Sequence, residues 1–559
     1  MPSPDELSSE SSTTVTEHRR DVEIQKPRSQ LPYLQRQFDQ AGISPAVLEW
    51  KYRGQGTTED PFIVDFIPDD PKNPMKFSEW KKWGITATQA IAVLAVTFVS
   101  TAYSGGIGTV ITEFKISEEV AILGISLFVI GFALGPLIWA PLSETYGRQI
   151  LFFFTYMGLA AFNAGAAGSQ NIQTLIILRF FAGTIGSSPL TNAGGVIADM
   201  FPATKRGLAT AMFATAPFLG PSIGPIVGGF LGSAGGWRWV EGLMAAFTGI
   251  LWIVGTLFIP ETYAPILLRR RSEKLSATTG KVYISKLDAG KPKKTVGQEF
   301  KIAMSRPWIL LFREPIVLLT SLFMAIVYGT LYMMFAAFPI VFQQQRGWSP
   351  GIGGLAFLGI AVGMLVSVAY SIYDNTRYAK TAAAHGGNAP PEARLPPAMI
   401  GSILLPVGLF WFAWTCQKEI HWIVSIIASG FFASGLVLVF LSLMNYTIDT
   451  YVMYAASALA ANSVLRSIFG AAFPLFTTAM YNNLGIHWAS SIPAFLAVLC
   501  LPFPFLFYKY GEAIRKRCKF SAEAAQVLAR MRTTSHENSP PPSQPPSEER
   551  EKASDTEQS

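Results

Sequence analysis

The chain has 559 residues, of which 50% are hydrophobic and only 14% are charged, and its mean hydropathy is +0.32. Soluble domains carry about 25% charged residues, so this composition excludes an ordinary soluble domain and indicates a membrane protein. The formal net charge of +7 comes mostly from bases between hydrophobic runs, which favours cytoplasmic loops over a nucleic-acid partner.

Residues 1–82 are predicted to form a cytoplasmic N-terminal tail that is mostly disordered. Its first part is rich in Ser, Thr, Gln, Asp and Glu and has no sustained hydrophobic period. Near its end, the stretch from Asp69 to Trp83 combines bases with two tryptophans, which is typical of an anchor at the membrane surface. The alternative is a generic segment ahead of the first span.

A membrane-spanning helix needs about 20 mainly apolar residues, and twelve runs of about that length occur in the sequence. They are expected at residues 84–104, 119–141, 150–169, 173–198, 207–232, 238–259, 315–342, 351–373, 397–416, 420–445, 456–480 and 488–508. The sequence therefore predicts an all-α polytopic membrane protein with twelve transmembrane helices in two pseudo-symmetric six-helix bundles, 83–260 and 314–510. A basic central loop, 261–313, separates the bundles, and a disordered cytoplasmic tail, 511–559, follows them.

The distribution of charge predicts the orientation. The central loop contains twelve Lys or Arg residues against four acidic residues, whereas the loops expected on the other side of the membrane carry few bases. By the positive-inside rule, the central loop and both termini are expected in the cytoplasm, and an even number of spans agrees with this. The plasma membrane is the expected location.

A short polar connection from Ser143 to Gln149 joins the second and third spans. Two helices joined so closely must turn sharply, which Gly147 permits. The stretch that begins at Gly135 resembles the loop motif between spans 2 and 3 of the major facilitator superfamily, Gly-x-x-x-(Asp/Glu)-x-x-Gly-Arg-(Arg/Lys/Gln). The resemblance implies a gating role for four residues, Glu144, Gly147, Arg148 and Asp199.

The same resemblance implies two contacts on the cytoplasmic face. Arg148, at the start of span 3, is expected to pair with Asp199, at the end of span 4. Glu144 is expected to approach the start of span 11 near Ser457, where the helix dipole favours an anion. In the second half, residues 373–377 are expected to form a worn copy of the acid-to-base turn between spans 8 and 9.

Span 5 contains glycines at every fourth position, Gly220, Gly224 and Gly228, which therefore lie on one helix face and allow a neighbouring helix to approach closely. The wider string resembles the Gly-x-x-x-Gly-Pro-x-x-Gly-Gly motif of antiporters in the superfamily, which symporters generally lack. The residues of this string are Gly220, Pro221, Gly224, Pro225, Gly228 and Gly229. The alternative is a tightly packed helix of a kind found in any polytopic protein.

Two arginines, Arg179 and Arg466, lie well inside predicted spans. A charged side chain in a membrane costs at least about 2.5 kcal/mol, so each should face a polar interior. Arg179 in span 4, together with Gly183, is similar to the Arg-x-x-x-Gly motif assigned to proton coupling in the superfamily. Two interpretations stay open for Arg179, namely proton coupling and bracing of neighbouring helices by hydrogen bonds. Arg466 in span 11 has the same ambiguity.

The resemblance also implies a central cavity lined by spans 1, 4, 7 and 10. The candidate substrate contacts are Tyr103, Asn192, Tyr328, Tyr332, Asn445 and Arg466, with Thr101 and Ser434 as further polar positions. Helix packing is the alternative role for the polar and aromatic candidates. Acidic residues are nearly absent from the predicted spans, whereas a polyamine would need buried carboxylates, so a neutral or weakly anionic amphiphile is the expected substrate.

After the sixth predicted span, the sequence Pro-Glu-Thr-Tyr-Ala-Pro at residues 260–265 resembles a signature of fungal twelve-span drug:proton antiporters. The resemblance to that branch extends from about Asp69 to Arg517. It implies a monomeric transporter in the lipid bilayer that exports small amphiphilic organic compounds, such as drugs, fungicides or secondary metabolites, in exchange for protons. The alternatives are an uptake permease of the same fold, a polyamine exporter and a non-transporting membrane receptor. No catalytic residue, metal, cofactor or nucleic-acid partner is expected, since the sequence has no Walker loop, no His-Glu-x-x-His and no zinc-binding spacing.

Overall fold

The computed structural model describes residues 37–202, 206–290, 295–385 and 389–524. The outer parts of both predicted tails, residues 1–36 and 525–559, lie outside the described residues. The described chain divides into two compact units. Residues 37–73 with 264–290 form the small unit, and residues 74–263 with 295–524 form the membrane unit.

The first half of the membrane unit consists of helices joined by short connections. Its elements are η2 Pro74–Lys76, α3 Glu79–Ala102, η3 Tyr103–Gly106, α4 Ile107–Phe114, α5 Glu118–Tyr146, α6 Arg148–Ala167, α7 Ile172–Gly186, α8 Ser188–Met200, α9 Arg206–Gly235 and α10 Trp237–Phe258. The segment α3–η3–α4 is one membrane span, and α7 with α8 is another. With α5, α6, α9 and α10, this half therefore supplies six spans.

The second half has the same kind of organisation. Its elements are α12 Val296–Arg313, α13 Pro315–Phe338, η4 Pro339–Gln345, α14 Pro350–Leu355, α15 Phe357–Ala384, η5 Pro391–Arg394, α16 Pro396–Thr415, α17 Trp422–Thr450, η6 Val452–Tyr454, α18 Ala455–Cys500 and α19 Pro502–Arg517. In η4 the α-helix widens into a π-helix. Here α12 precedes the bundle, and α13 begins its first span.

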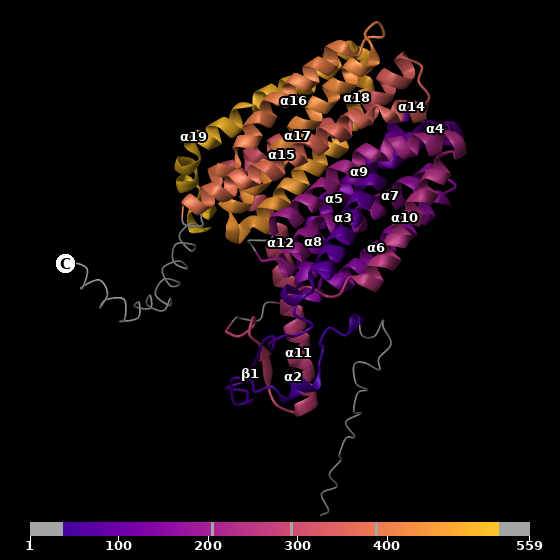
Figure 1. Cartoon of the computed structure of the whole chain (residues 1–559). Coiled ribbons are helices and arrows are strands. Elements are labelled where there is room, and N and C mark those ends of the chain that lie inside the picture. The colour runs from indigo at the N-terminus through magenta and orange to yellow at the C-terminus, as the bar shows by residue number, and fades with distance from the viewer. Residues whose placement is uncertain (1–36, 203–205, 291–294, 386–388, 525–559) are drawn as a thin grey trace, which may run out of the picture. The chain divides into compact units, whose positions relative to one another are not determined.

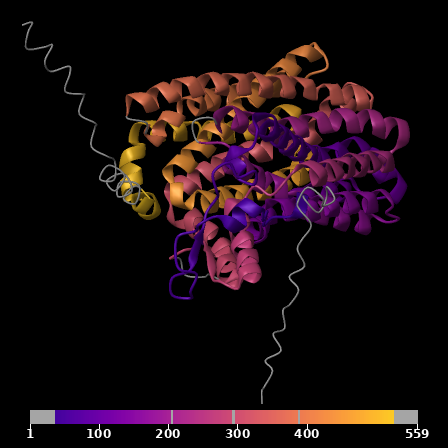
Figure 2. The same ribbon diagram turned by 60° about the horizontal axis from the view of Figure 1, so that its bottom comes forward.

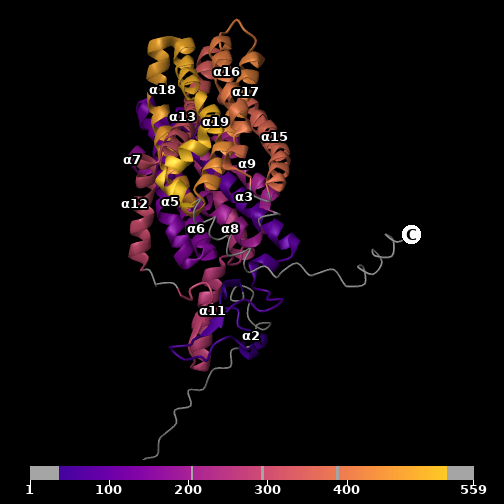
Figure 3. The ribbon, with the colours of Figure 1, turned by 90° about the vertical axis from the view of Figure 1, so that its left-hand side faces the viewer.

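The number of spans depends on one glycine. Within the described residues, eleven helices are long and apolar enough to cross a membrane, and the last of these runs from Val452 to Arg517. This long helix is interrupted at Gly485, where φ is 73° and ψ is 164°. A positive φ is inexpensive only for glycine, so the chain reverses here and the helix supplies two spans, as the hairpin in Figure 3 shows. The predicted total of twelve spans is confirmed.

The twelve spans form two bundles that repeat the same packing. Figures 1 and 2 show the indigo-to-magenta helices of the first half beside the orange-to-yellow helices of the second. In each half the first span packs against the fifth, as α3 on α9 and as α13 on α18, and the second packs against the fourth, as α5 on α7–α8 and as α15 on α17. The halves meet where α5 contacts α18 and where α9 contacts α14 and α15. The predicted pseudo-symmetric fold is thereby confirmed.

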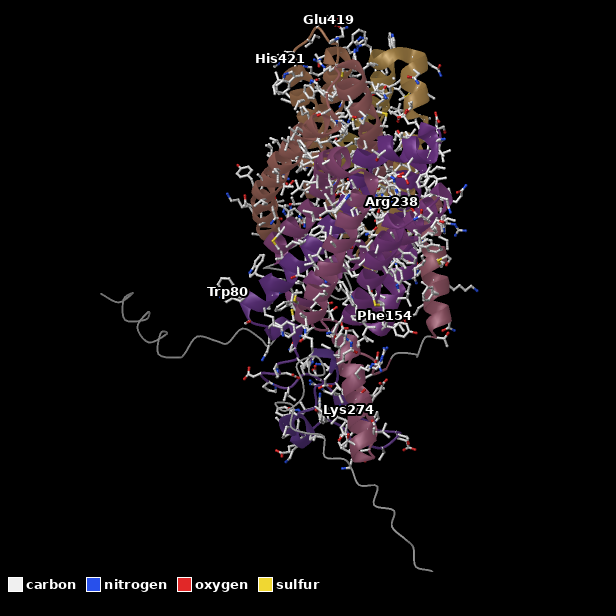
Figure 4. All side chains as sticks on the ribbon, turned by 90° about the vertical axis from the view of Figure 1, so that its right-hand side faces the viewer. Trp80, Phe154, Arg238, Lys274, Glu419 and His421 are labelled. Atoms are coloured by element: carbon white, nitrogen blue, oxygen red, sulfur yellow. The ribbon has the colours of Figure 1, made fainter. Side chains whose placement is uncertain are left out.

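Because successive spans run in opposite directions, the connections between them alternate between the two ends of the membrane unit. We call the end with the connection between α5 and α6 the α5–α6 end, and the other the opposite end. Trp80 and Phe154 lie toward the α5–α6 end, and Glu419 and His421 lie at the opposite end (Figure 4). Trp80 is 91% exposed on the first turn of α3, within the stretch predicted to anchor the chain at the membrane surface.

The end of the bundle differs from the predicted tail. The sequence predicts disorder from residue 511, yet α19 continues to Arg517, and both Cys518 and Ala524 are buried. The backbone N–H of Phe520 donates to the Glu314 carboxylate at 3.1 Å. Residues 511–524 are therefore part of the packed bundle. The sequence did not predict this because the amphipathic α19 has a charged final turn, which resembles a tail in composition.

The small unit is a second difference, because the sequence predicts a disordered tail and a loop where the structure has folded segments. It contains α2 Pro45–Glu49, β1 Phe62–Val64, α11 Ala264–Thr279 and β2 Tyr283–Ser285. The two strands pair in parallel with Phe62 opposite Tyr283. A small core of Val47, Val64, Leu268 and Leu275 lies beside them.

A buried ion pair completes the small unit. Arg271 on α11 pairs with Asp70, and each side chain is 1% exposed. The Arg271 Nε also donates to the Ala41 carbonyl at 3.1 Å. Charges are retained in an apolar interior only when they are paired and hydrogen-bonded, so this contact ties the N-terminal segment specifically to the segment after the sixth span.

Candidate functional site

The connection between α5 and α6 is built around Gly147, whose φ is 97°. The Glu261 side chain, from the segment after α10, fills the space beside this glycine, since a Cβ there would lie 2.8 Å from Glu261 Cδ. The Glu261 carboxylate accepts the first backbone N–H groups of α6, from Arg148 at 3.0 Å and Gln149 at 3.2 Å. It therefore caps α6, and its negative charge interacts favourably with the positive end of the α6 helix dipole. Burial raises the pKa of the Glu261 carboxyl above its ordinary value. The hydrogen bonds from backbone N–H groups act in the opposite direction but are the smaller effect.

Arg148, the next residue, lies at the centre of a polar cluster. Its Nε is 3.5 Å from Asp199 Oδ2, with the two side chains 12% and 15% exposed. Its Nη1 donates to Ser143 and, at 3.2 Å, to Asn192 Oδ1, and its guanidinium lies over the Tyr263 ring. The predicted Arg148–Asp199 pair is therefore present, while its gating role stays a prediction. Asn192, predicted to face a substrate cavity, belongs to this cluster instead.

The other predicted gating residue, Glu144, is exposed on the last turn of α5. Its helix does contact α18, because Ala133 and Leu137 form one apolar cluster with Ala460 and Val464. The specific approach of Glu144 to Ser457 stays a prediction.

The second half has a counterpart of the Arg148–Asp199 pair that sequence reasoning missed. Residues 373–377 do not form the predicted turn, because α15 continues as a helix to Ala384 and Asp374 pairs with Arg377 within it. The base that matches Arg148 is Arg394, whose Nε is 2.9 Å from Asp449 Oδ2 at the end of α17. Asp449 ends the fourth span of its half, as Asp199 does, and that symmetry was the signal that could have identified the pair.

A second site lies in the interior of the first half, where Arg179 of α7 pairs with Glu241 of α10. Arg179 Nη1 is 2.6 Å from Glu241 Oε1, and both side chains are 0% exposed. The remaining donors of Arg179 are directed at backbone carbonyls, with Nε 2.9 Å from Gly124 on α5 and Nη2 3.2 Å from Val99 on α3. One guanidinium thus links four spans, and Glu241 is a buried acid that the sequence analysis did not single out.

Aromatic rings enclose this ion pair. The Arg179 guanidinium lies 4.3 Å from the centroid of the Tyr103 ring and 5.2 Å from that of Phe128. Tyr103 is 1% exposed and donates to the Ala121 carbonyl at 3.1 Å, so it encloses the pair instead of lining the predicted cavity. Gly183 allows α7 to approach α5, since a Cβ there would lie 2.8 Å from the Phe128 carbonyl carbon.

The glycine string of α9 has two faces. Gly220, Gly224 and Gly228 face α3, and a Cβ on Gly224 would overlap Thr101 Oγ1 and lie 2.8 Å from the backbone nitrogen of Ala102. Thr101 donates to the Pro221 carbonyl at 3.1 Å, and this carbonyl receives no helical hydrogen bond from residue 225 because Pro225 lacks an N–H. Thr101 therefore takes part in helix packing, which is the alternative role given above for the polar candidates.

The second face of α9 contacts the other half of the protein near the opposite end. A Cβ on Gly229 would lie 2.5 Å from the Pro350 carbonyl oxygen, and a Cβ on Gly354 would lie 2.7 Å from the Pro225 carbonyl oxygen. Helix α14 therefore packs backbone to backbone on α9. Ser434 has a similar packing role within the second half, donating to the Gly363 carbonyl at 2.8 Å.

The remaining cavity candidates gather where the halves meet. Tyr328 and Tyr332 are buried on α13, and their hydroxyls are 3.4 Å apart. Tyr332 also forms a 3.0 Å hydrogen bond with Ser100 of α3. Arg466 of α18 lies over the Tyr328 ring at 4.9 Å. Asn445 is partly exposed on α17.

Comparison with known proteins identifies the family. The family profile described as "Major Facilitator Superfamily" matches residues 89–474, which is more than half of the chain. The chain belongs to the major facilitator superfamily. The similarity to fungal members is extensive. The "MFS-type efflux pump MFS2" of Trichophyton rubrum is 63% identical over 503 residues, covering 90% of this chain and 84% of the relative.

Two further superfamily relatives carry related descriptions. The "Major facilitator superfamily multidrug transporter mdrA" of Aspergillus fumigatus is 60% identical over 501 residues, covering 90% of this chain and 82% of the relative. The "Efflux pump FUB11" of Gibberella moniliformis is 59% identical over 503 residues, covering 90% and 85%. These relatives support an efflux transporter role for this member of the superfamily, in a multi-pass membrane protein.

Solved structures of the superfamily share the fold. The structure described as the "proton:xylose symporter XylE bound to 6-bromo-6-deoxy-D-glucose" has a TM-score of 0.56 and 17% sequence identity, covering 78% of this chain and 96% of the other. At this identity the likeness shows the fold alone. It supports the arrangement of the chain as two helical bundles.

Proposed function

We propose that the chain exports small amphiphilic organic compounds from the cytoplasm across the plasma membrane in exchange for protons. In this proposal it acts as a monomer, with the α5–α6 end and both termini in the cytoplasm. The relatives described as efflux pumps support export, and the basic residues after the sixth span support the orientation. The observation that carries proton exchange is the buried pair of Arg179 and Glu241.

Glu241 is suited to hold a proton during transport. A carboxylate without access to water is stable as an anion only beside a positive charge, which Arg179 supplies. Its second oxygen, Oε2, has no hydrogen-bond partner among the described residues, so one position for a proton is unused. Protonation would remove the ion pair and leave Arg179 bound to carbonyls of α3 and α5. The protonation state of Glu241 is thereby coupled to the packing of four spans.

Contacts between the halves near each end of the membrane unit would define two states of the transporter. The protonation state of Glu241 would change the balance between these states. Near the opposite end, α9 and α14 approach at Gly229 and Gly354, closely enough that no side chain fits between them. At the α5–α6 end, Thr145 donates to Glu299 of α12 at 3.4 Å. In the proposed orientation, release to the outside requires the α9–α14 contact to open, and loading from the cytoplasm requires contacts at the α5–α6 end to open.

The test uses purified protein in vesicles with an imposed proton gradient and a labelled apolar drug. Wild type should accumulate the drug only while the gradient lasts, so a protonophore should abolish accumulation. Glu241→Gln, which resembles the protonated form in shape, should lose gradient-driven accumulation but retain exchange of labelled for unlabelled drug. The matched control is Glu113→Gln, which neutralises the acid of the partly exposed Glu113–Arg238 pair and should leave coupling intact.

Two results would contradict the proposal. If accumulation continues after the proton gradient has collapsed, transport is not proton-driven. If Glu241→Gln couples like wild type, the proton is carried elsewhere. The uptake alternative is tested in cells, where an exporter lowers and a permease raises retention of a compound panel. A polyamine in that panel tests the polyamine exporter, which the neutralisation of Glu241 by Arg179 disfavours.

A further inference from the structure

Arg466 differs from every other arginine that lies deep in the bundle, because its charge is not neutralised by the protein. It lies near the middle of the first span of α18. No carboxylate lies within ion-pair distance of its guanidinium in the part of the chain that the structure describes. The titratable groups facing it are the phenols of Tyr328 and Tyr332, which are neutral partners.

The hydrogen bonds of Arg466 are also incomplete. Nη2 donates to Ser463 Oγ at 3.2 Å, one turn earlier on the same helix. Nε is buried and has no partner among the described residues, although the side chain as a whole retains some accessible surface. An Nε–H with an adjacent Nη–H forms the fork that binds a carboxylate through two parallel hydrogen bonds. Within this fork, Nη2 donates one hydrogen to Ser463, whereas Nε and the second hydrogen of Nη2 are left for a carboxylate.

Arg179 provides an internal comparison. Both residues are arginines in the bundle interior, but Arg179 has Glu241 at 2.6 Å and backbone carbonyls at its other nitrogens. Arg179 is therefore saturated by its own protein. A guanidinium stays protonated under all ordinary conditions, so Arg466 cannot relieve its unpaired charge by losing a proton. An anion that binds there would neutralise the unpaired charge of Arg466.

The surroundings of Arg466 favour a flat apolar body beside the anion. The guanidinium lies 4.9 Å from the centroid of the Tyr328 ring and 5.1 Å from that of Phe440. Phe440 in turn contacts Phe218 of the first half edge to face, with centroids 5.0 Å apart. Aromatic rings pack favourably on one another and on a guanidinium. The site thus combines one cation with aromatic surfaces from both halves.

We propose that Arg466 binds the carboxylate of the transported compound, and that the preferred substrates are small aromatic monocarboxylic acids in their anionic form. This inference rests on the proposed export function and specifies its substrate class. The hydroxyl contacts from Tyr328 through Tyr332 to Ser100 extend the site to α3. An anion bound at Arg466 therefore influences a contact between the two halves, which is where a transported substrate must act.

The experiment compares 1-naphthoate with 1-naphthamide, which has the same ring system without the negative charge. Binding is measured first, as the rise in Tm of the purified full-length protein, and transport into vesicles is measured second. Wild type should bind the acid at least about tenfold more tightly than the amide, since charge-assisted bidentate pairs are roughly twice as strong as neutral ones. Arg466→Gln should abolish this preference by weakening binding of the acid much more than binding of the amide, and Arg466→Lys should restore part of it.

Each outcome decides the inference. Equal loss of acid and amide binding in Arg466→Gln would mean that the residue only supports the fold, and would overturn the inference. A wild type that prefers the amide would overturn it as well. If the acid binds through Arg466 but neither compound is transported in a proton gradient, the inference stands and the proposed function fails. If the amide is exported and the acid is not, the proposed function stands and the inference fails.

Discussion

Neutralising Arg179 and Glu241 one at a time should destabilise the protein much more than neutralising both. Each side chain is 0% exposed, and the ion pair is 2.6 Å long. Removing one partner of such a pair leaves an uncompensated buried charge, which costs about 3–5 kcal/mol. Replacing both partners by neutral groups avoids that cost, so we expect Arg179→Gln and Glu241→Gln together to lose only about 1–3 kcal/mol, mainly through lost hydrogen bonds.

The resulting coupling energy should be at least about 3 kcal/mol, at the upper end of values for contacting residues. It can be measured as a double-mutant cycle on the free energy of unfolding in mixed micelles. The control cycle uses Arg394 and Asp449, which are 24% and 27% exposed, and for which about 0–1 kcal/mol is expected. Additive losses at Arg179 and Glu241 would refute the reasoning, because they would mean that the pair is screened despite its burial. The double variant should also lack proton-driven transport even though it is stable.

Three other changes test other parts of the structure. Arg148→Asp and Asp199→Arg should each impair export, and the double swap should recover part of it; a swap no better than the single variants, in the same vesicle assay, would exclude a gating pair. Gly224→Leu should reach the membrane but transport poorly, because overpacking against α3 costs about 1–3 kcal/mol, whereas Gly242→Leu, where no atom lies within 4 Å of the position of a Cβ, should transport normally. Glu261→Ala should lower the free energy of unfolding by about 2 kcal/mol through loss of the α6 cap, and an unchanged value would show that water replaces it.

Hydrophobic run length predicted the spans well, because every span must present enough apolar surface to cross the membrane core. Features of the short connection between α5 and α6 were also predicted. The turn at Gly147 and the pair of Arg148 with Asp199 lie close to helix ends, where sequence order alone restricts their positions. The residues that complete these sites were not predicted, since Glu261 reaches Gly147 from the far end of the first half.

Glu241 shows why the interior was harder to predict. The predicted span 238–259 contains Glu241, but run length alone does not show that this acid is buried and paired. The signal that could have identified it is helical spacing, because Glu241 shares a face with Met244, Thr248 and Leu251, all of which are buried. Spacing reveals such a face, but only the packing of α10 against α6, α9 and α3 decides that it points to protein and not to lipid. The same limit explains why Tyr103 and Asn192 were assigned to a cavity.

The small unit was missed for a different reason. Its strands have three residues each, which is too short for a recognisable pattern, and its ion pair joins residues on either side of the first six spans. Nothing local to either segment specifies the other. Long-range pairing of this kind is visible only once the chain is folded.

That pairing sets an order of events during synthesis. β1 and Asp70 leave the ribosome before the first span, but β2 and Arg271 follow only after the sixth, about 200 residues later. At about 5–20 residues per second, the N-terminal segment waits some 10–40 seconds without a partner. When β2 emerges, all six spans of the first half have already been made, so closure of the small unit marks a completed half before the second half begins. A chain truncated before residue 283 could never reach that state, and its unpaired strand would remain available to quality-control proteases.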